Sequence, residues 1–150
     1  MMELQMLESS LIELSSLCEQ LAALLESKRQ AMKVWQVEQV EALTMEEELL
    51  LERVRSEDQG FRQALERLAR DQRMTTTEIL NHPKASRLRA LRARVETAQR
   101  AVRQQGAMTQ ALADHLTGFL KKMQGETSAS VLTYGPGLSA LQRSRPFLMN

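Results

Sequence analysis

Residues 25–44 decide the fold of this chain; they read LESKRQAMKVWQVEQVEALT. On either side of this stretch apolar residues recur at steps of three and four, which is the spacing of one face of an α-helix. The phase of that spacing slips between Val34 and Val37. We call each such row of apolar residues a stripe. A tight helix–helix turn at residues 33–36 keeps the spacing regular within the stripe on each side.

The helical pattern around this turn is too long to belong to one helix. No Gly or Pro occurs before Gly60, so residues 3–59 would otherwise form a helix of about 85 Å. A chain of 150 residues could not bury one face of so long a helix, and an unburied helix is marginal in water. Thr44 is a rival boundary, because Thr44-Met45-Glu46-Glu47 has the spacing of a capping box. We favour the turn at 33–36, since it preserves both registers.

Further boundaries follow along the chain. Thr75 and Glu78 have capping-box spacing for a short helical turn, and Pro83 suits the start of a new helix, which Gly125 ends. The apolar stripes include Leu4, Leu7, Leu11, Leu14, Cys18, Leu21 and Leu25, then Val37, Val40, Leu51, Val54, Phe61, Leu65 and Leu68, then Leu88, Leu91, Val95, Ala98, Val102, Leu112, Leu116, Phe119 and Met123. The sequence predicts an all-α, elongated antiparallel three-helix bundle with helices near 3–33, 36–73 and 84–124.

Residues 125–150 differ from the rest of the chain. Gly, Pro and Ser recur through them and would break any helix, yet apolar side chains are interspersed. These apolar residues are Val131, Leu132, Tyr134, Leu138, Leu141, Phe147, Leu148 and Met149. We therefore expect a helical body at 1–124 and a flexible, irregular C-terminal interaction tail at 125–150. Such a tail commonly becomes ordered on a partner, and the alternative is that it tucks against its own helices.

The composition narrows the class of protein. Aromatic residues make up 3% of the chain, against nine Met, and there are only six Gly and three Pro. These figures argue against collagen-like chains, disulfide scaffolds and β-sandwiches. Residues 1–58 hold 13 acidic and 5 basic side chains, whereas residues 59–150 hold 6 acidic and 15 basic. We expect helices from these two parts, of net charge −8 and +9, to face one another.

Nothing in the sequence indicates export or a membrane span. The N-terminus lacks a basic region, and Glu8 and Glu13 interrupt its apolar positions, so no secretory signal is expected. No stretch approaches the roughly 20 consecutive apolar residues that span a bilayer. Cys18 is the single cysteine and cannot form an internal disulfide. We expect a cytoplasmic protein without membrane insertion.

The sequence gives no support to catalytic or metal chemistry. Cys18, His82 and His115 lie on separate elements without a ligand partner at helical spacing, so no metal site is expected. There is no Gly-x-Ser-x-Gly and no Gly-rich phosphate loop. Residues 114–118, DHLTG, faintly resemble the active helix of histidine phosphotransfer domains, but Thr117 stands where that chemistry wants a Lys. We expect no enzyme and no cofactor.

The charged and apolar faces of the predicted helices suggest three kinds of binding partner: a nucleic acid, a second copy of the chain or another protein. Seven basic side chains between Lys84 and Arg103 could contact phosphates, yet no aromatic residue interleaves them for base stacking. We therefore expect no nucleic-acid partner. A self-associating coiled-coil scaffold or adaptor is one alternative, because the same stripes could pair two chains. As a monomer or weak homodimer, the chain would instead offer a groove between long helices to another protein's amphipathic helix.

Several stretches together resemble a known family. Residues 26–32 read ESKRQAM, residues 37–44 VEQVEALT and residues 47–54 EELLLERV. The third predicted helix ends in Phe119-Leu120, and Tyr134-Gly135-Pro136-Gly137 follows a short polar stretch. This order is similar to the leucine-rich helix, turn, second helix and tyrosine-bearing tail of the FlgN family of flagellar type III export chaperones.

The resemblance implies a chaperone with two kinds of partner. It would bind the C-terminal helical segments of hook–filament junction proteins, prevent their premature assembly and deliver them to the type III export gate. In the family a tail tyrosine engages the cytoplasmic domain of the gate protein, which implies that role for Tyr134. The other expected partner contacts are Val131, Leu132, Leu138, Phe119, Leu116 and Leu112.

Overall fold

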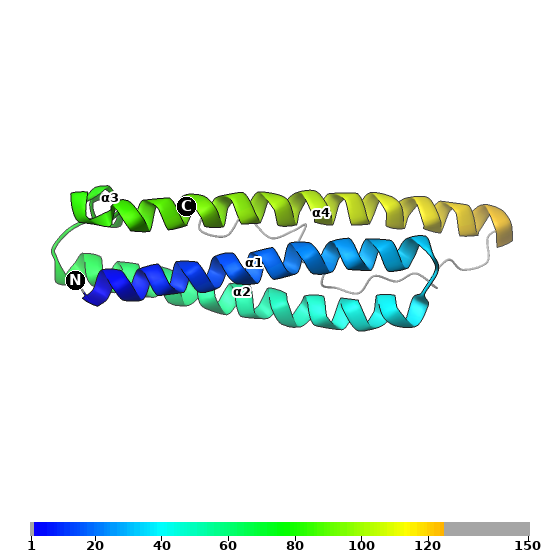
Figure 1. Ribbon diagram of the computed structural model, residues 1–150, viewed down its shortest axis with the longest axis horizontal. Helices are drawn as coiled ribbons and strands as arrows, with labels where there is room; N and C mark the ends of the chain where they lie inside the picture. Colours follow the sequence, from blue (N-terminus) through cyan, green and yellow to red (C-terminus); the bar gives the residue numbers. More distant parts are fainter. Residues whose placement is uncertain (1, 125–150) are drawn as a thin grey trace.

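Three long helices form the body of the protein, with a short helical connection before the third (Figure 1). The computed structural model describes residues 2–124. Its elements are α1 (Met2–Lys33), α2 (Val37–Asp71), α3 (Thr76–Asn81), the 3₁₀ turn η1 (Pro83–Ala85) and α4 (Ser86–Gln124). Residues 2–124 contain no strand, so the predicted all-α class is confirmed. The predicted tail lies outside the described residues, and the division into body and tail stays a prediction.

The helices run up, down and up, so α1 and α4 point the same way and α2 opposes both (Figure 1). α1 packs against α2 and also against α4, whereas α2 and α4 make few close contacts with each other. α1 is therefore the central helix of the bundle. Figure 1 also shows that the last turns of α4 continue past the turn that joins α1 to α2.

The turn after α1 forms where the sequence predicts it. The amide of Gln36 donates to the carbonyl of Ala31 (3.0 Å), and the amide of Trp35 donates to the carbonyl of Met32 (3.2 Å). This pair of bonds is the Schellman motif, which closes a helix through a residue in the left-handed region. That residue is Trp35, with φ 58°. Glycine is the usual residue at this position, but here the position is taken by a tryptophan. The turn therefore lacks the glycine by which a sequence normally indicates it.

α2 ends in the same way and leads into a capped short helix. The amide of Met74 donates to the carbonyl of Ala69 (2.9 Å), and Arg73 has φ 54°. The Thr75 hydroxyl then accepts from the Glu78 amide (3.1 Å), while the Glu78 carboxylate accepts from the Thr75 amide (3.1 Å). The predicted capping box is therefore confirmed, and it starts α3.

Thr44, the rival boundary, lies inside α2. Its hydroxyl donates to the carbonyl of Val40 one turn earlier (2.8 Å), and the side chain is buried. The Thr44-Met45-Glu46-Glu47 stretch is therefore not a capping box. Glu47 instead points into the bundle, where it is fully buried.

The apolar core consists of two separate clusters. The first cluster is the larger; its buried members are Leu4, Leu7, Leu11, Leu14, Leu17, Cys18, Leu21, Leu25, Leu51, Val54, Phe61, Leu65, Leu68, Ala69, Ile79, Ala85, Leu88, Val95, Ala98 and Val102. The end cluster lies beside the α1–α2 turn and consists of Ala31, Met32, Val40, Ala113 and Leu116, with Leu43, Leu112 and Leu120 partly buried against it. Most residues of the predicted stripes therefore form the core, but Phe119 and Met123 are exposed and the core is not continuous.

A layer of polar side chains separates the two clusters. This polar layer consists of Lys28 and Arg29 of α1, Thr44 and Glu47 of α2, and Gln105 and Thr109 of α4. Lys28 Nζ donates to Glu47 Oε1 (2.9 Å), and both side chains are fully buried. Arg29 donates to the side-chain oxygen of Gln105. All three long helices thus meet through charged or hydrogen-bonded groups at one level of the bundle.

The environment of the Glu47 side chain is energetically unfavourable for a charged carboxylate. Its second oxygen, Oε2, is buried and has no hydrogen-bond partner in the described part of the chain. Burial raises the pKa of the Glu47 carboxyl, because the loss of hydration outweighs the attraction of Lys28; the neighbouring Glu48 raises it further. Lys28 therefore offsets only part of the cost of burying this charge.

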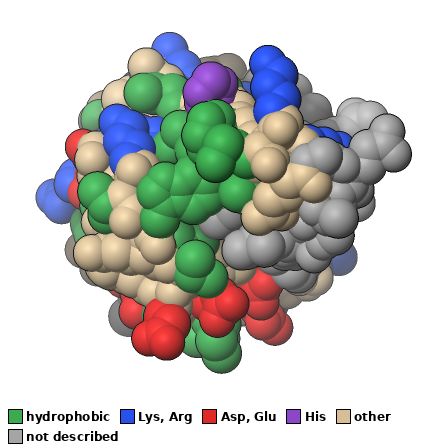
Figure 2. Space-filling view, turned by 90° about the vertical axis from the view of Figure 1, so that its right-hand side faces the viewer, with side chains coloured by type: hydrophobic (Ala, Val, Ile, Leu, Met, Phe, Trp, Pro, Cys, Tyr) green, Lys and Arg blue, Asp and Glu red, His purple; other side chains and the backbone are tan. Residues whose placement is uncertain are grey.

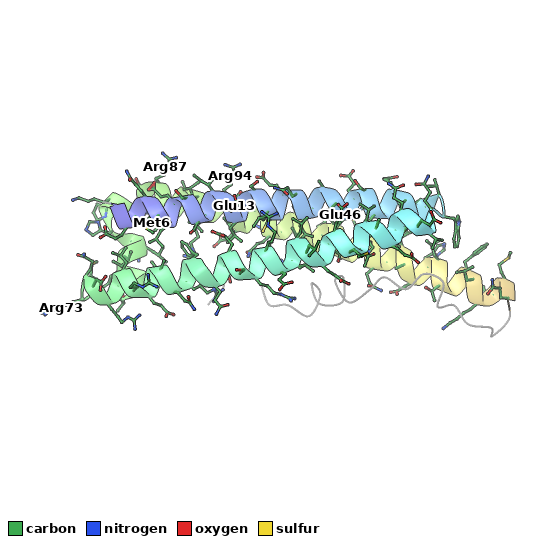
Figure 3. The ribbon with its side chains drawn as sticks, turned by 90° about the horizontal axis from the view of Figure 1, so that it is seen from below. Met6, Glu13, Glu46, Arg73, Arg87 and Arg94 are labelled. Carbon is green, nitrogen blue, oxygen red and sulfur yellow. The ribbon has the colours of Figure 1, made fainter. Side chains whose placement is uncertain are left out.

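Exposed ion pairs join the oppositely charged helices. Arg87 lies 3.5 Å from Glu8 and Arg94 lies 3.4 Å from Glu19, so the basic helix α4 does face the acidic helix α1 (Figure 3). The side chains of both arginines remain more than half exposed. Such pairs contribute little stability, at most about 1 kcal/mol each, and chiefly favour one orientation of the helices.

Replacement of Lys28 tests the buried pair. Lys28→Met should lower the free energy of unfolding by about 3–5 kcal/mol, because it leaves the Glu47 charge buried without its partner. The double variant Lys28→Met/Glu47→Leu should regain most of that loss, since no charge then remains. Urea unfolding followed by circular dichroism measures both. Equal losses in the single and double variants would contradict this account.

The single variant should also respond to pH. Glu47 already has a raised pKa in the folded state, and loss of Lys28 should raise it further. Folding then favours the protonated carboxyl, so its stabilising contribution is present at acid pH and is lost as the pH rises through the folded-state pKa. The deficit of Lys28→Met should therefore shrink as the pH is lowered from 7 toward the ordinary pKa of a glutamate. A deficit that grows on acidification would be the opposite result.

The left-handed residue at the end of α2 gives a second prediction. Arg73 is exposed and pays for its positive φ, so Arg73→Gly should raise the free energy of unfolding by about 1 kcal/mol. Arg70→Gly is the matched control, because Arg70 is also exposed but helical, and it should lower stability by about 1 kcal/mol. Thermal unfolding of the two variants should move in opposite directions.

Candidate functional site

Exposed apolar side chains gather at the end of the bundle where α1 meets α2. Val34 and Trp35 of the turn are 61% and 41% exposed, and Phe119 and Met123 in the last turns of α4 are 48% and 70% exposed. We call these four residues the end face. Figure 2 shows hydrophobic side chains in the middle of this end, with acidic side chains below them and basic ones above. An apolar patch with a charged rim is typical of a protein-binding surface.

Two residues of the end face, Phe119 and Met123, lie in the last turns of α4. α4 is a 39-residue helix, the longest in the described chain, and its last turns pass the α1–α2 turn (Figures 1 and 3). Beyond that turn neither α1 nor α2 is present to cover the apolar stripe of α4. Leu120, one residue after Phe119, is still partly buried against the end cluster, so Phe119 is exposed because it lies off the face of α4 that packs against α1 and α2. Met123 lies near the end of α4 and is the most exposed of the four residues.

The structure places the predicted contact residues in three different settings. Phe119 lies on the end face. Leu116 is buried in the end cluster and Leu112 is partly buried against it, so both face α1 and α2. Val131, Leu132, Tyr134 and Leu138 lie outside the described residues. Among the predicted contact residues that the structure describes, only Phe119 is exposed at the surface, while Leu112 and Leu116 belong to the packing of the end cluster.

The sequence pattern does not indicate that two residues of the end face lie on a binding surface. The sequence predicts that Val34 and Trp35 lie at the turn, which the structure confirms, but it assigns them no role at a surface. Trp35 is the single tryptophan of the chain, and a large aromatic residue at a turn between two leucine-rich helices was the available signal. Met123 was included in the third stripe as a core position, and its 70% exposure corrects that expectation.

Two grooves run along the sides of the bundle. One, of about 560 Å³, lies at the seam of α1 and α2 and is lined by Gln20, Glu46, Leu49, Leu50, Glu52 and Arg53. The other, of about 430 Å³, lies between α2, α3 and α4, where Phe61, Leu65 and Leu80 meet Arg62, Glu66 and Arg92. Both are short, and both mix apolar and charged side chains.

Cys18 and His82 both have structural roles in the described part of the chain. Cys18 is fully buried in the first cluster, and burial raises the pKa of its thiol to about 12, so the nucleophilic thiolate is not formed at neutral pH. His82 accepts a hydrogen bond from the Lys84 amide (3.1 Å) and thereby caps η1. Among residues 2–124 no three His, Cys, Asp or Glu side chains lie close enough together to hold a metal ion.

None of the helices within residues 2–124 combines the length and the hydropathy that crossing a bilayer requires. The exposed large apolar side chains of the described chain include the end face, Met6 and Ile12 of α1, Met45 and Leu49 of α2 and Met108 of α4. The geometry is suited to binding another polypeptide by burial of apolar side chains.

Comparison with known proteins agrees with this reading. No curated protein and no solved structure matches the chain. The family model described as FlgN protein matches residues 1–140, which is nearly the whole chain. With a helical bundle, an exposed apolar end and this match, the chain belongs to the FlgN family of flagellar export chaperones.

Proposed function

We propose that this chaperone binds the C-terminal helical segments of hook–filament junction proteins, keeps them unassembled and delivers them to the type III export gate. The observation that carries the proposal is the end face, where Val34, Trp35, Phe119 and Met123 are exposed at one end of the bundle. Membership of the FlgN family supports the chaperone role in general. Delivery is assigned to Tyr134 in the C-terminal segment, on the family resemblance alone.

The chemistry of the end face suits such a client. Segments that form helices in an assembled filament have an apolar stripe, and outside the filament that stripe is exposed and prone to aggregate. A helix of this kind can lay its apolar residues across Phe119 and Met123 in the direction of Trp35. The charged rim would fix the direction of the client, and apolar burial would supply most of the affinity.

A double substitution on the end face tests client binding. Phe119→Ser/Met123→Ser should weaken binding of a client C-terminal peptide about tenfold or more, because it removes two large apolar contacts. Binding can be followed by the fluorescence of Trp35, which lies at the same end of the bundle. The matched control is Met6→Ser/Ile12→Ser, because these residues are exposed on α1 away from the end face (Figure 3 labels Met6).

The outcomes of this experiment are distinct. The control variant should bind the peptide as the unaltered protein does. Equal weakening by both pairs would show that apolar exposure in general, and not the end face, holds the client. Unchanged binding by the Phe119→Ser/Met123→Ser variant, with the protein folded by circular dichroism, would refute the end face as the client site.

The proposed division between binding and delivery has its own test. Tyr134→Ala should leave the affinity for the client peptide unchanged and should reduce export of the client from cells severalfold. Thr133→Ala is the neighbouring control and should change neither quantity. Loss of peptide binding in Tyr134→Ala would place this residue in the client site instead and would contradict a separate gate contact.

A further inference from the structure

The end of α4 is held to the rest of the bundle by a small set of contacts. In the end cluster only Ala113 and Leu116 of α4 are buried, and their buried partners are Ala31, Met32 and Val40. The first cluster is several times larger and holds the N-terminal part of α4 against α1. Because hydrophobic stabilisation grows with the apolar area buried, the end cluster can open at a smaller cost than the first cluster.

The polar layer marks where such an opening would stop. On the α4 side it consists of Gln105, which accepts from Arg29, and Thr109, whose hydroxyl donates to the Gln105 carbonyl (2.8 Å) and lies 3.4 Å from the Leu25 carbonyl. Across the layer Glu47 Oε2 is buried without a hydrogen-bond partner among the described residues. Water that enters on opening would hydrate these groups, which lowers the cost of separation there.

The backbone of α4 is weakest at the same level. Gly106 follows Gln105 directly and is buried within the helix. Glycine is the poorest helix former after proline, because it loses the most backbone freedom on folding and has no side chain to pack. α2 contributes one buried residue, Val40, to the end cluster, while few backbone positions of α2 and α4 approach closely. Three independent features, namely the small cluster, the polar groups and the glycine, therefore coincide at one boundary.

We propose that α4 separates from the α1–α2 hairpin as a unit from Gly106 to Gln124, while the first cluster stays packed. The opened state exposes Met32 and Val40 on the hairpin and Ala113 and Leu116 on α4. These residues adjoin the end face, so opening enlarges the apolar surface that a client helix can cover. This use of the opening rests on the proposed function, whereas the opening itself is a property of the chaperone alone.

Thiol labelling of the full chain without client tests the opening. Cys18 is fully buried in the first cluster and serves as an internal reference for opening of that cluster. In the variant Ala113→Cys the new thiol takes a fully buried position of the end cluster. The thiol at 113 should react with excess DTNB at least tenfold faster than Cys18 in the same molecule. Equal rates would mean that both clusters open only together, and would overturn the proposal.

Two further positions locate the boundary. Met32→Cys lies on the hairpin side of the end cluster and should react as fast as Ala113→Cys, because one separation exposes both. Val102→Cys lies on α4 in the first cluster and should react as slowly as Cys18. Fast labelling at 102 would mean that α4 leaves along its whole length. Slow labelling at 32 beside fast labelling at 113 would indicate fraying of α4 from its end. Either result would overturn the proposal.

A variant of the boundary itself completes the test. Arg29→Leu/Gln105→Leu replaces the polar pair between α1 and α4 with apolar side chains and should slow labelling at 113 at least fivefold. Gly118→Ala is the control, because a Cβ added there meets no neighbouring atom and the site lies beyond the boundary; it should change the ratio of labelling at 113 to that at 32 by less than twofold. No change in the boundary variant would refute the role of the polar layer. Since no client is present, client binding can succeed or fail independently.

Discussion

The burial of α1 by two neighbours is the constraint on which the rest of the structure depends. α1 packs against both α2 and α4, while α2 and α4 scarcely meet. A central helix of this kind needs apolar residues over a wide arc, and the α1 residues of the first cluster provide it. The two outer helices are then free to differ in length. α4 is the longer of the two and extends past the α1–α2 turn (Figure 1).

The polar layer fixes how the helices of this bundle are aligned along one another. A buried Lys28–Glu47 pair fits only one register of α1 against α2, because any shift would leave two charges without partners. The layer also divides the core, so the apolar contacts at the turn end are separate from the larger cluster. Stability is therefore concentrated away from the end face, where a client-binding surface needs room to adapt.

Much of the fold could be predicted from local sequence patterns. The turn near Val34 and the capping box at Thr75 were found because a phase slip and a short polar motif are properties of neighbouring residues. The polar layer could not be found in this way. Lys28 and Glu47 each interrupt a stripe, and nothing local shows that residues 19 positions apart will face one another. Arg29 and Gln105 are separated by 76 positions.

The candidate site also has features that local sequence predicts and features that depend on tertiary packing. The sequence by itself determined the three helices, the opposed charges and the apolar character of Phe119, because periodicity and composition fix what each helix must bury. Only the tertiary structure decided that Leu116 is covered while Phe119 and Met123 are not. The reason is geometric: exposure on α4 depends on which of its faces the α1–α2 hairpin covers and on where that hairpin ends, and both are set by the packing of all three helices together.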